Sequence, residues 1–178
     1  KVYTIEAFKP LFDEISSKYI DISNISFIYG NSKEQLLDVL LEINKPAIFW
    51  LDAHYSGDGT FGQKDKCPLI DEILTINKFE HENIILIDDA RVFLSPPAVT
   101  HDINEWPNIS EIINLLNSVT GRYIIILEDV IFCVPDRMKN FTAKYSQELN
   151  SLNSLINSDG LSIIKKILKF IIRKIKSL

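Results

Sequence analysis

The chain has 178 residues, of which 46% are hydrophobic, 24% charged and 10% aromatic, values typical of a soluble globular protein that exclude a disulfide scaffold. The net charge is −5, but residues 160–178 contain six Lys or Arg and no acid. Residues 1–159 therefore have 13 basic and 24 acidic side chains, a net charge of −11 that argues against a nucleic-acid-binding surface.

The two cysteines, Cys67 and Cys133, lie far apart in the sequence and lack CxxC spacing. Cysteines of this kind suit a reduced compartment, so the cytoplasm is the expected location. No signal peptide is visible, and the chain begins inside a predicted strand. This start suggests a fragment of a longer protein.

The first part of the chain alternates short apolar runs with helical patterns. Residues 2–5 form a β-branched and aromatic run, and the segment after Glu6 carries a helical apolar stripe. Residues 25–29 predict a second strand, after which Ser32 is expected to cap a helix while Gln35 bonds back to it. The residues expected to face the core from these two helices are Phe8, Leu11, Phe12, Ile15, Tyr19, Leu36, Leu37, Leu40, Leu41 and Ile43.

Two further apolar runs, residues 47–51 and 84–87, lack the alternation of a half-exposed strand and predict fully buried strands. Pro68 opens the helix that is expected between them. The inward residues of this helix are expected to be Leu69, Ile70, Ile73 and Leu74. Residues 92–107 are rich in proline and polar side chains, which predicts an ordered loop.

The next elements are a helix and a pair of strands. Asn108 or Ser110 is expected to cap the helix, which carries its apolar face on Ile109, Ile112, Ile113 and Leu116. Residues 123–127 and 130–134 are separated by only two residues, which predicts a tight hairpin. Strand–helix alternation followed by a hairpin predicts an α/β fold with a mostly parallel sheet and an antiparallel edge.

The C-terminal part of the chain has a different composition. Residues 138–160 are polar and rich in asparagine and serine, which predicts an exit helix and a linker after a domain spanning residues 1–137. Residues 161–178 predict an amphipathic helix with one basic face, too charged to span a bilayer. Two interpretations are open: contact with an anionic membrane surface, or packing against its own domain or a partner subunit such as a second copy of the chain.

Polar residues follow the first two predicted strands. Glu6 stands where a carboxylate can accept hydrogen bonds from ribose hydroxyls, although an acid there also stabilises a helix N-terminus. Gly30 allows the backbone to approach a ligand, and Asn31 could bond an adenine edge. Helix capping alone would explain Ser32.

Three acids follow the two buried strands: Asp52, Asp88 and Asp89. Neighbouring parallel strands would deliver them to one crevice, where a hard cation such as Mg²⁺ could take their oxygens. The alternative is that one acid points into the crevice while the others pair with Lys or Arg, for example Arg91. His54, two residues beyond Asp52, can take a proton near neutral pH, which predicts a base or a ligand rather than a structural histidine.

Several segments carry a family resemblance. They are Val2-Tyr3-Thr4-Ile5-Glu6, Gly30-Asn31-Ser32, Phe49-Trp50-Leu51-Asp52-Ala53-His54, Cys67-Pro68-Leu69 with Asp71-Glu72, and Ile87-Asp88-Asp89-Ala90-Arg91. In these segments the chain resembles class I S-adenosylmethionine-dependent methyltransferases, and most closely bacterial and viral members associated with glycan modification. The resemblance covers residues 2–135 and leaves out the basic tail.

The resemblance implies a Rossmann-like three-layer sandwich with a pocket for S-adenosylmethionine. In such a pocket Glu6 would hold the ribose and Asn31 the adenine, while Gly30, Ser32 and Asp52 would also line the cofactor. The family's first strand and its glycine-rich turn should lie just before the first strand of this chain. Without them a gap is expected between the strands at residues 2–5 and 47–51, unless something else fills it.

The resemblance also implies the chemistry. Asp52, Asp88 and Asp89 match positions that ligate Mg²⁺ in metal-dependent sugar and catechol O-methyltransferases. A metal there would bind a hydroxyl of a sugar or another small acceptor and lower its pKa, and His54 or a carboxylate such as Asp52 would remove the proton. Residues 93–106 would line the acceptor site.

Two rival functions are open from the sequence. The first is a nucleotide-sugar glycosyltransferase, in which Asp88 and Asp89 would bind a diphosphate through a divalent metal. The second is a degenerate, non-catalytic domain that binds a partner or a membrane through residues 161–178.

Overall fold

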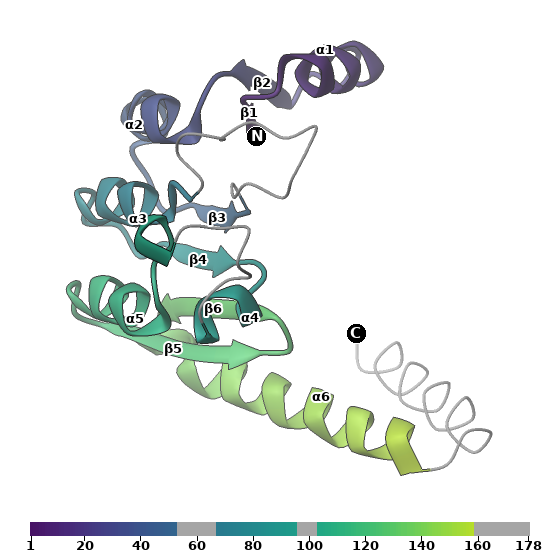
Figure 1. The fold of residues 1–178 in the computed structure, drawn as a ribbon, viewed down its shortest axis with the longest axis vertical. Coiled ribbons are helices and arrows are strands. Elements are labelled where there is room, and N and C mark those ends of the chain that lie inside the picture. Colours follow the sequence, from purple (N-terminus) through teal and green to yellow (C-terminus); the bar gives the residue numbers. More distant parts are fainter. Residues whose placement is uncertain (53–66, 96–102, 159–178) are drawn as a thin grey trace. The chain divides into compact units, whose positions relative to one another are not determined.

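The computed structural model describes residues 1–52, 67–95 and 103–158. The chain divides into two compact units, Lys1–Asp136 and Arg137–Leu178. Figure 1 shows the elements, which in chain order are β1 (Val2–Glu6), α1 (Lys9–Lys18), β2 (Ile25–Tyr29), α2 (Ser32–Ile43), β3 (Ile48–Leu51), α3 (Leu69–Asn77), β4 (Ile84–Ile87), α4 (Arg91–Leu94), the 3₁₀ turn η1 (Ile103–Glu105), α5 (Ile109–Asn117), β5 (Arg122–Leu127), β6 (Val130–Pro135), η2 (Asp136–Met138) and α6 (Lys139–Ser158). The predicted α/β alternation is confirmed.

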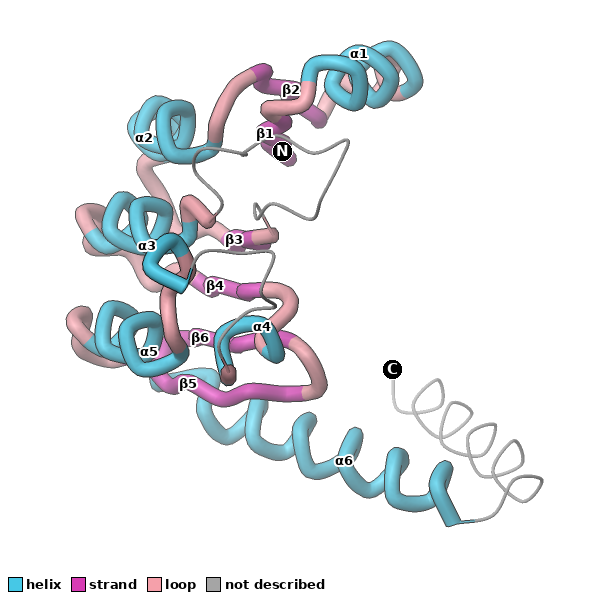
Figure 2. The backbone as a smooth tube through the Cα atoms, in the orientation of Figure 1, coloured by secondary structure: helices cyan, strands magenta, loops and turns pink. Residues whose placement is uncertain are grey.

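The described strands of the first unit form two separate sheets, which Figure 2 shows as two groups of magenta segments. In the first sheet β1 pairs with β2 in parallel, with Val2 opposite Ile25. The second sheet has the strand order β3-β4-β6-β5, in which β3 and β4 are parallel and β6 is antiparallel to both of its neighbours. The predicted hairpin is confirmed, and its turn residue Glu128 adopts a positive φ of 54°. The sheets are thus small and mixed, rather than one mostly parallel sheet.

The core lies between the second sheet and the helices that Figure 1 shows on one side of its strands. Alternate strand residues point into it, and they meet residues of α2, α3 and α5. The buried members include Leu36, Leu40, Phe49, Leu51, Ile73, Ile76, Ile85, Ile87, Ile112, Leu116, Ile131 and Cys133. Burial of such side chains is the main stabilising term for this unit.

The expectation that β3 is buried on both faces is wrong. Ile48 and Trp50 on one face are 69% and 58% exposed, whereas Phe49 and Leu51 on the other face are buried. In β4 the same alternation places Ile85 and Ile87 in the core. The reason is that the described helices of this unit contribute their core residues to one face of the sheet.

The predicted helix faces are confirmed in part. Leu36 and Leu40 are buried as expected, but Leu41 is 61% exposed, and Leu37 and Leu74 are exposed as well. The remaining inward position of α2 is taken by Val39, which is buried. All residues expected on the inner face of α5 are buried or packed against the core.

Of the predicted capping residues, the one for α2 is wrong and the one for α5 is confirmed. Asn31, and not Ser32, caps α2, because its side-chain oxygen accepts a hydrogen bond from the Lys33 N–H at 3.1 Å. Asn108 caps α5 in a reciprocal capping box with Glu111, as one of the two expected residues. The predicted loop at residues 92–107 begins instead with the short helix α4 and contains η1.

The second unit contains α6, a helix of 20 residues. The expected exit helix after residue 138 is thereby confirmed, and it continues through Ser158. The predicted amphipathic helix at residues 161–178 lies outside the described residues. None of the described helices is both long enough and apolar enough to cross a membrane.

Candidate functional site

A cavity of about 1080 Å³ lies in the first unit, between β1 and β3. One side is formed by residues 1–8, which include all of β1, and the other by residues 45–52, which include all of β3. Residues of α2 and the segment 30–32 close it further. The gap expected between these two strands is therefore present among the described residues, and it forms a cavity.

The predicted cofactor residues line this one cavity. They are Glu6, Gly30, Asn31, Ser32 and Asp52. Each of them stands at or just beyond the carboxyl end of β1, β2 or β3, and ligands bind at this edge in α/β sheets. The structure therefore brings together side chains that are up to 46 positions apart in the sequence.

Glu6 takes the role of an acid at a helix start, and ribose binding by the same carboxylate stays a prediction. Its Oε1 accepts a hydrogen bond from the Phe8 N–H at 2.7 Å, at the start of α1. Its backbone oxygen accepts from the Gly30 N–H at 3.0 Å, which ties the ends of β1 and β2 together. Oε2 is engaged by no described residue, so the carboxylate can accept further hydrogen bonds at the cavity.

Gly30 is held in a conformation that other residues rarely adopt. Its φ is 145°, and a Cβ atom added there would come within 2.9 Å of the Gln35 side chain. Any other residue would be strained there and would press on Gln35, so the position favours glycine, and Gly30 lines the cavity. The Asn31 side-chain oxygen caps α2, whereas its amide nitrogen donates to no residue in the described part of the chain.

Glu72 is a site residue that the sequence analysis did not single out from its residues alone. Its side chain lines the cavity, although the residue is only 2% exposed. Burial, with a smaller contribution from the negative charge of Asp71, raises the pKa of the Glu72 carboxyl from 4.5 to about 7, while nearby Ser32 acts in the opposite direction. The Ser32 Oγ is itself buried and has no hydrogen bond of standard geometry.

A signal for Glu72 is present in the sequence. Leu69, Glu72, Ile73 and Ile76 follow the spacing of one buried helix face, and all four are buried in α3. An acid within an apolar helical stripe indicates a buried carboxyl, and such groups with a shifted pKa cluster at functional sites.

Asp52 and Glu72 also line a second, small cavity, and there they are joined by Asp88. The strands β3 and β4 place Asp52 and Asp88 there, because the Asp88 N–H donates to the backbone oxygen of Leu51 at 3.0 Å. Asp88 Oδ1 accepts from the Asp89 N–H at 2.8 Å. Two of the three predicted metal ligands thus lie at one point of the sheet edge.

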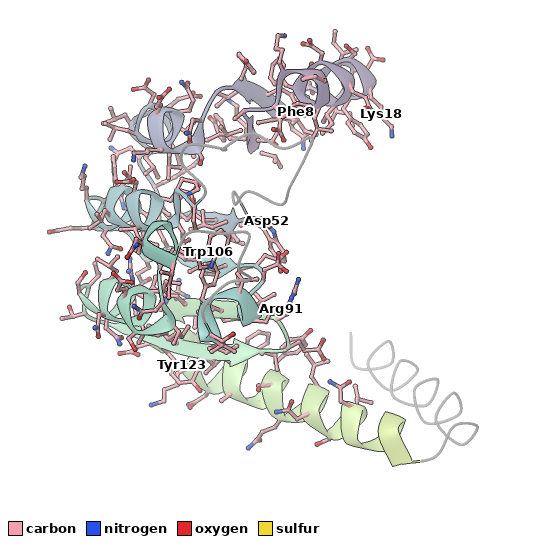
Figure 3. The ribbon with its side chains drawn as sticks, viewed as in Figure 1. Phe8, Lys18, Asp52, Arg91, Trp106 and Tyr123 are labelled. Carbon is pink, nitrogen blue, oxygen red and sulfur yellow. The ribbon has the colours of Figure 1, made fainter. Side chains whose placement is uncertain are left out.

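Asp89 is engaged differently. It adopts a φ of 54°, and its carboxylate forms an ion pair with Arg91 at 2.7 Å. The Arg91 guanidinium also pairs with Asp129 in the hairpin turn. In addition, the backbone N–H of Arg91 donates to the Asp129 carboxylate at 2.9 Å. Figure 3 shows Asp52 and Arg91 at the sheet edge where β3 and β4 end. For Asp89 the structure therefore shows the alternative in which an arginine holds the acid.

No group of three His, Cys, Asp or Glu side chains within residues 1–52, 67–95 and 103–158 is arranged to hold a metal ion. The assignment of Asp52, Asp88 and Asp89 to Mg²⁺ stays a prediction. His54, the expected base, lies outside the described residues, so its role also stays a prediction.

The ends of the expected acceptor loop pack into the core. The rings of Phe93 and Trp106 stack with centroids 6.0 Å apart, and both residues are buried. The Trp106 Nε1–H donates to the Val92 oxygen at 3.0 Å. Phe93 also lines the small cavity beside Asp52 and Asp88.

Comparisons of the chain with protein-family models, with curated proteins and with solved structures found no match.

Proposed function

We propose that the cavity between β1 and β3 binds S-adenosylmethionine, and that the chain is part of a methyltransferase acting on a hydroxyl of a sugar or another small acceptor. The observation that supports this proposal is the convergence of Glu6, Asn31 and Asp52, from the ends of three different strands, on one cavity. The proposal extends the coarse α/β architecture to a Rossmann-like three-layer sandwich, in which one further strand between β1 and β3 would join the two sheets.

The residues present fit an adenosine group. Ribose hydroxyls are donors, and Glu6 offers them carboxylate oxygen at the end of β1. The Asn31 amide nitrogen is a donor for a ring nitrogen of a base, and Gly30 lines the same cavity without a side chain. At about 1080 Å³ the cavity is large enough for such a ligand, since small-molecule sites span roughly 300–1,000 Å³.

The bound cofactor would supply an activated methyl group, and the chain's own residues would orient the acceptor and take its proton. Glu72 is suited to hold a proton near neutral pH, because burial raises the pKa of its carboxyl to about 7. It lies beside both Asp52 and Asp88, which are themselves acceptors for hydroxyl groups. His54 is the other candidate base from the sequence.

Calorimetric titration of the full chain with S-adenosylhomocysteine tests this proposal. Glu6→Gln should weaken binding by about tenfold to a hundredfold, because a hydrogen bond to a charged group contributes about 1.5–3 kcal/mol. Glu42→Gln is the matched control, since Glu42 lines the same cavity at its opposite end and pairs with Lys1. The control should bind as the unchanged chain does.

Two results would contradict the proposal: no binding by the unchanged chain, or equal weakening by Glu6→Gln and Glu42→Gln. Titration with a nucleoside-diphosphate sugar distinguishes the rival enzyme. Binding of that sugar in place of S-adenosylhomocysteine would favour a glycosyltransferase.

A further inference from the structure

The strand β2 has a free edge on the side away from β1. It pairs with β1 on one side, and no described strand pairs with it on the other. In a parallel pair, alternate residues direct both of their backbone groups to the same neighbour. The Asn24 oxygen accepts a hydrogen bond from the Val2 N–H, and the Gly30 N–H donates to the Glu6 oxygen. The even-numbered residues of β2 therefore face β1, and the odd-numbered residues face outwards.

Most of the outward backbone groups of β2 are open. Phe27 and Tyr29 each direct an N–H and a C=O outwards, and these groups form no hydrogen bond within the described ranges of the chain. Ile25 directs its C=O outwards, while its N–H is already bonded to the Ile22 oxygen at 3.1 Å. An unpaired edge of this kind is a template for pairing with another strand.

The edge of β2 also lacks the usual protection against strand pairing. Natural edges are commonly blunted by charged side chains, bulges or proline. Residues 25–29 include no charge and no proline, and they pair with β1 in continuous register. Large apolar side chains are exposed at both ends of the strand, since Ile22 is 42% and Tyr29 49% exposed. Apolar surface gathered along one edge indicates an interaction site.

The strand is suited to pair with its own copy in the antiparallel direction. With Phe27 on a twofold axis, the two copies of Phe27 exchange both backbone hydrogen bonds, and each Tyr29 N–H reaches the open oxygen of Ile25 in the other copy. The side chains that meet are then Phe27 with Phe27, and Ile25 with Tyr29. Such aromatic and β-branched pairs stabilise antiparallel strands. Because β2 carries no charge, its pairing with itself involves no like-charge repulsion within the strand.

The helix α1 would pack beside its own copy in this arrangement. It contacts both β1 and β2, and its Phe12 ring lies 5.4 Å from the Tyr29 ring between centroids. Since α1 spans both strands, the two copies of α1 would lie about two strand spacings, or roughly 10 Å, apart. This is the ordinary distance between packed helices. Lys9, over the Tyr29 ring, pairs with Asp13, so the flank of α1 beside β2 brings no net charge to the contact.

We propose that two copies of the chain associate through β2, with these strands antiparallel about a twofold axis at Phe27. The two small sheets would then form one sheet in the order β1-β2-β2-β1. The partner is a second copy because the open backbone groups and the side chains of β2 match their own reverse. Residues 25–29 line neither described cavity, so the dimer does not depend on the proposed cofactor site.

Sedimentation velocity and amide hydrogen exchange of the full chain test this proposal. With rising protein concentration the chain should change from monomer to dimer. Exchange at Phe27 and Tyr29 should slow by at least about tenfold over the same range. Exchange at Ser26 and Ile28 should not depend on concentration, since these amides face β1.

Two variants of one position separate strand pairing from ordinary surface contact. Tyr29→Pro and Tyr29→Val both remove the aromatic ring, but only proline removes the outward N–H, and neither removes an N–H that faces β1. The proline variant loses one hydrogen bond between copies from each chain. Its dimer dissociation constant should therefore be about tenfold or more above that of the valine variant. Circular dichroism of both variants checks that the fold is intact.

Four results would overturn the proposal. A chain that stays monomeric at all concentrations would exclude the dimer. A dimer with fast exchange at Phe27 and Tyr29 would have another interface. Slow exchange at these amides in the monomer would show that the chain covers its own edge. Equal dissociation constants of the folded proline and valine variants would exclude pairing through the backbone of β2.

Discussion

Glu72 is the residue whose environment differs most from what its type suggests. A carboxyl that is almost fully buried loses its hydration, and this loss raises its pKa to about 7. The native state therefore holds a proton that the unfolded chain, with a pKa near 4.5, releases. The contribution of this carboxyl to the free energy of unfolding is fully present below pH 4.5. It decreases as the pH rises and is lost above pH 7.

Replacing Glu72 by glutamine should remove this pH dependence. The free energy of unfolding of Glu72→Gln relative to the unchanged chain should be greater at pH 8 than at pH 4.5, by roughly 3 kcal/mol at most. Urea unfolding at both pH values measures the difference. Glu34→Gln, on the exposed side of α2, is the control and should show no such difference. A difference of the opposite sign would mean that Glu72 is charged in the native state.

The places of candidate site residues were predictable where they follow directly from the ends of strands. Glu6, Asn31 and Asp52 were assigned from their places after strands, and the structure gathers them at one cavity. Asp89 was not separable from Asp88, because the arginine that pairs with Asp89 is also held by Asp129, 40 positions away from Asp89 in the sequence. Local pattern contains no information about such a partner.

At the scale of elements, the strands were predicted well because apolar, β-branched runs specify them. The exposure of Ile48 and Trp50 was not predicted, because a run of apolar residues does not reveal which face a neighbouring helix covers. The sequence predicted Ser32 as the cap of α2, one residue after the actual cap, Asn31. Both residue types are good caps, so their identity alone does not decide between them.

The capping box of α5 offers a test at this scale. Asn108→Ala removes an acceptor that holds the Glu111 N–H at 3.1 Å, and it should lower the free energy of unfolding by about 1 kcal/mol. Ser110→Ala, at an exposed position in the same turn, should change it by less than about 0.5 kcal/mol. Equal effects of the two substitutions in denaturant titrations would contradict the assigned role of Asn108.

At the scale of the first unit, the main feature is a sheet divided into two parts. The family resemblance predicted a gap at this place, and the structure shows open edges of β1 and β3 with a cavity between them. The three-layer sandwich implied by the resemblance stays a prediction, because the described core lies on one face of the larger sheet. The candidate cofactor residues thus lie at one cavity between two separate sheets.

The most direct test of the account is to locate ligand binding on the chain. In a nuclear magnetic resonance titration with S-adenosylhomocysteine, the backbone amide signals of Glu6, Asn31 and Asp52 should shift together. The signal of Tyr123, at the start of β5 and away from the cavity lining, should not move. Absence of shifts at the three strand ends, or shifts as large at Tyr123 as at Glu6, would contradict a cofactor site between β1 and β3.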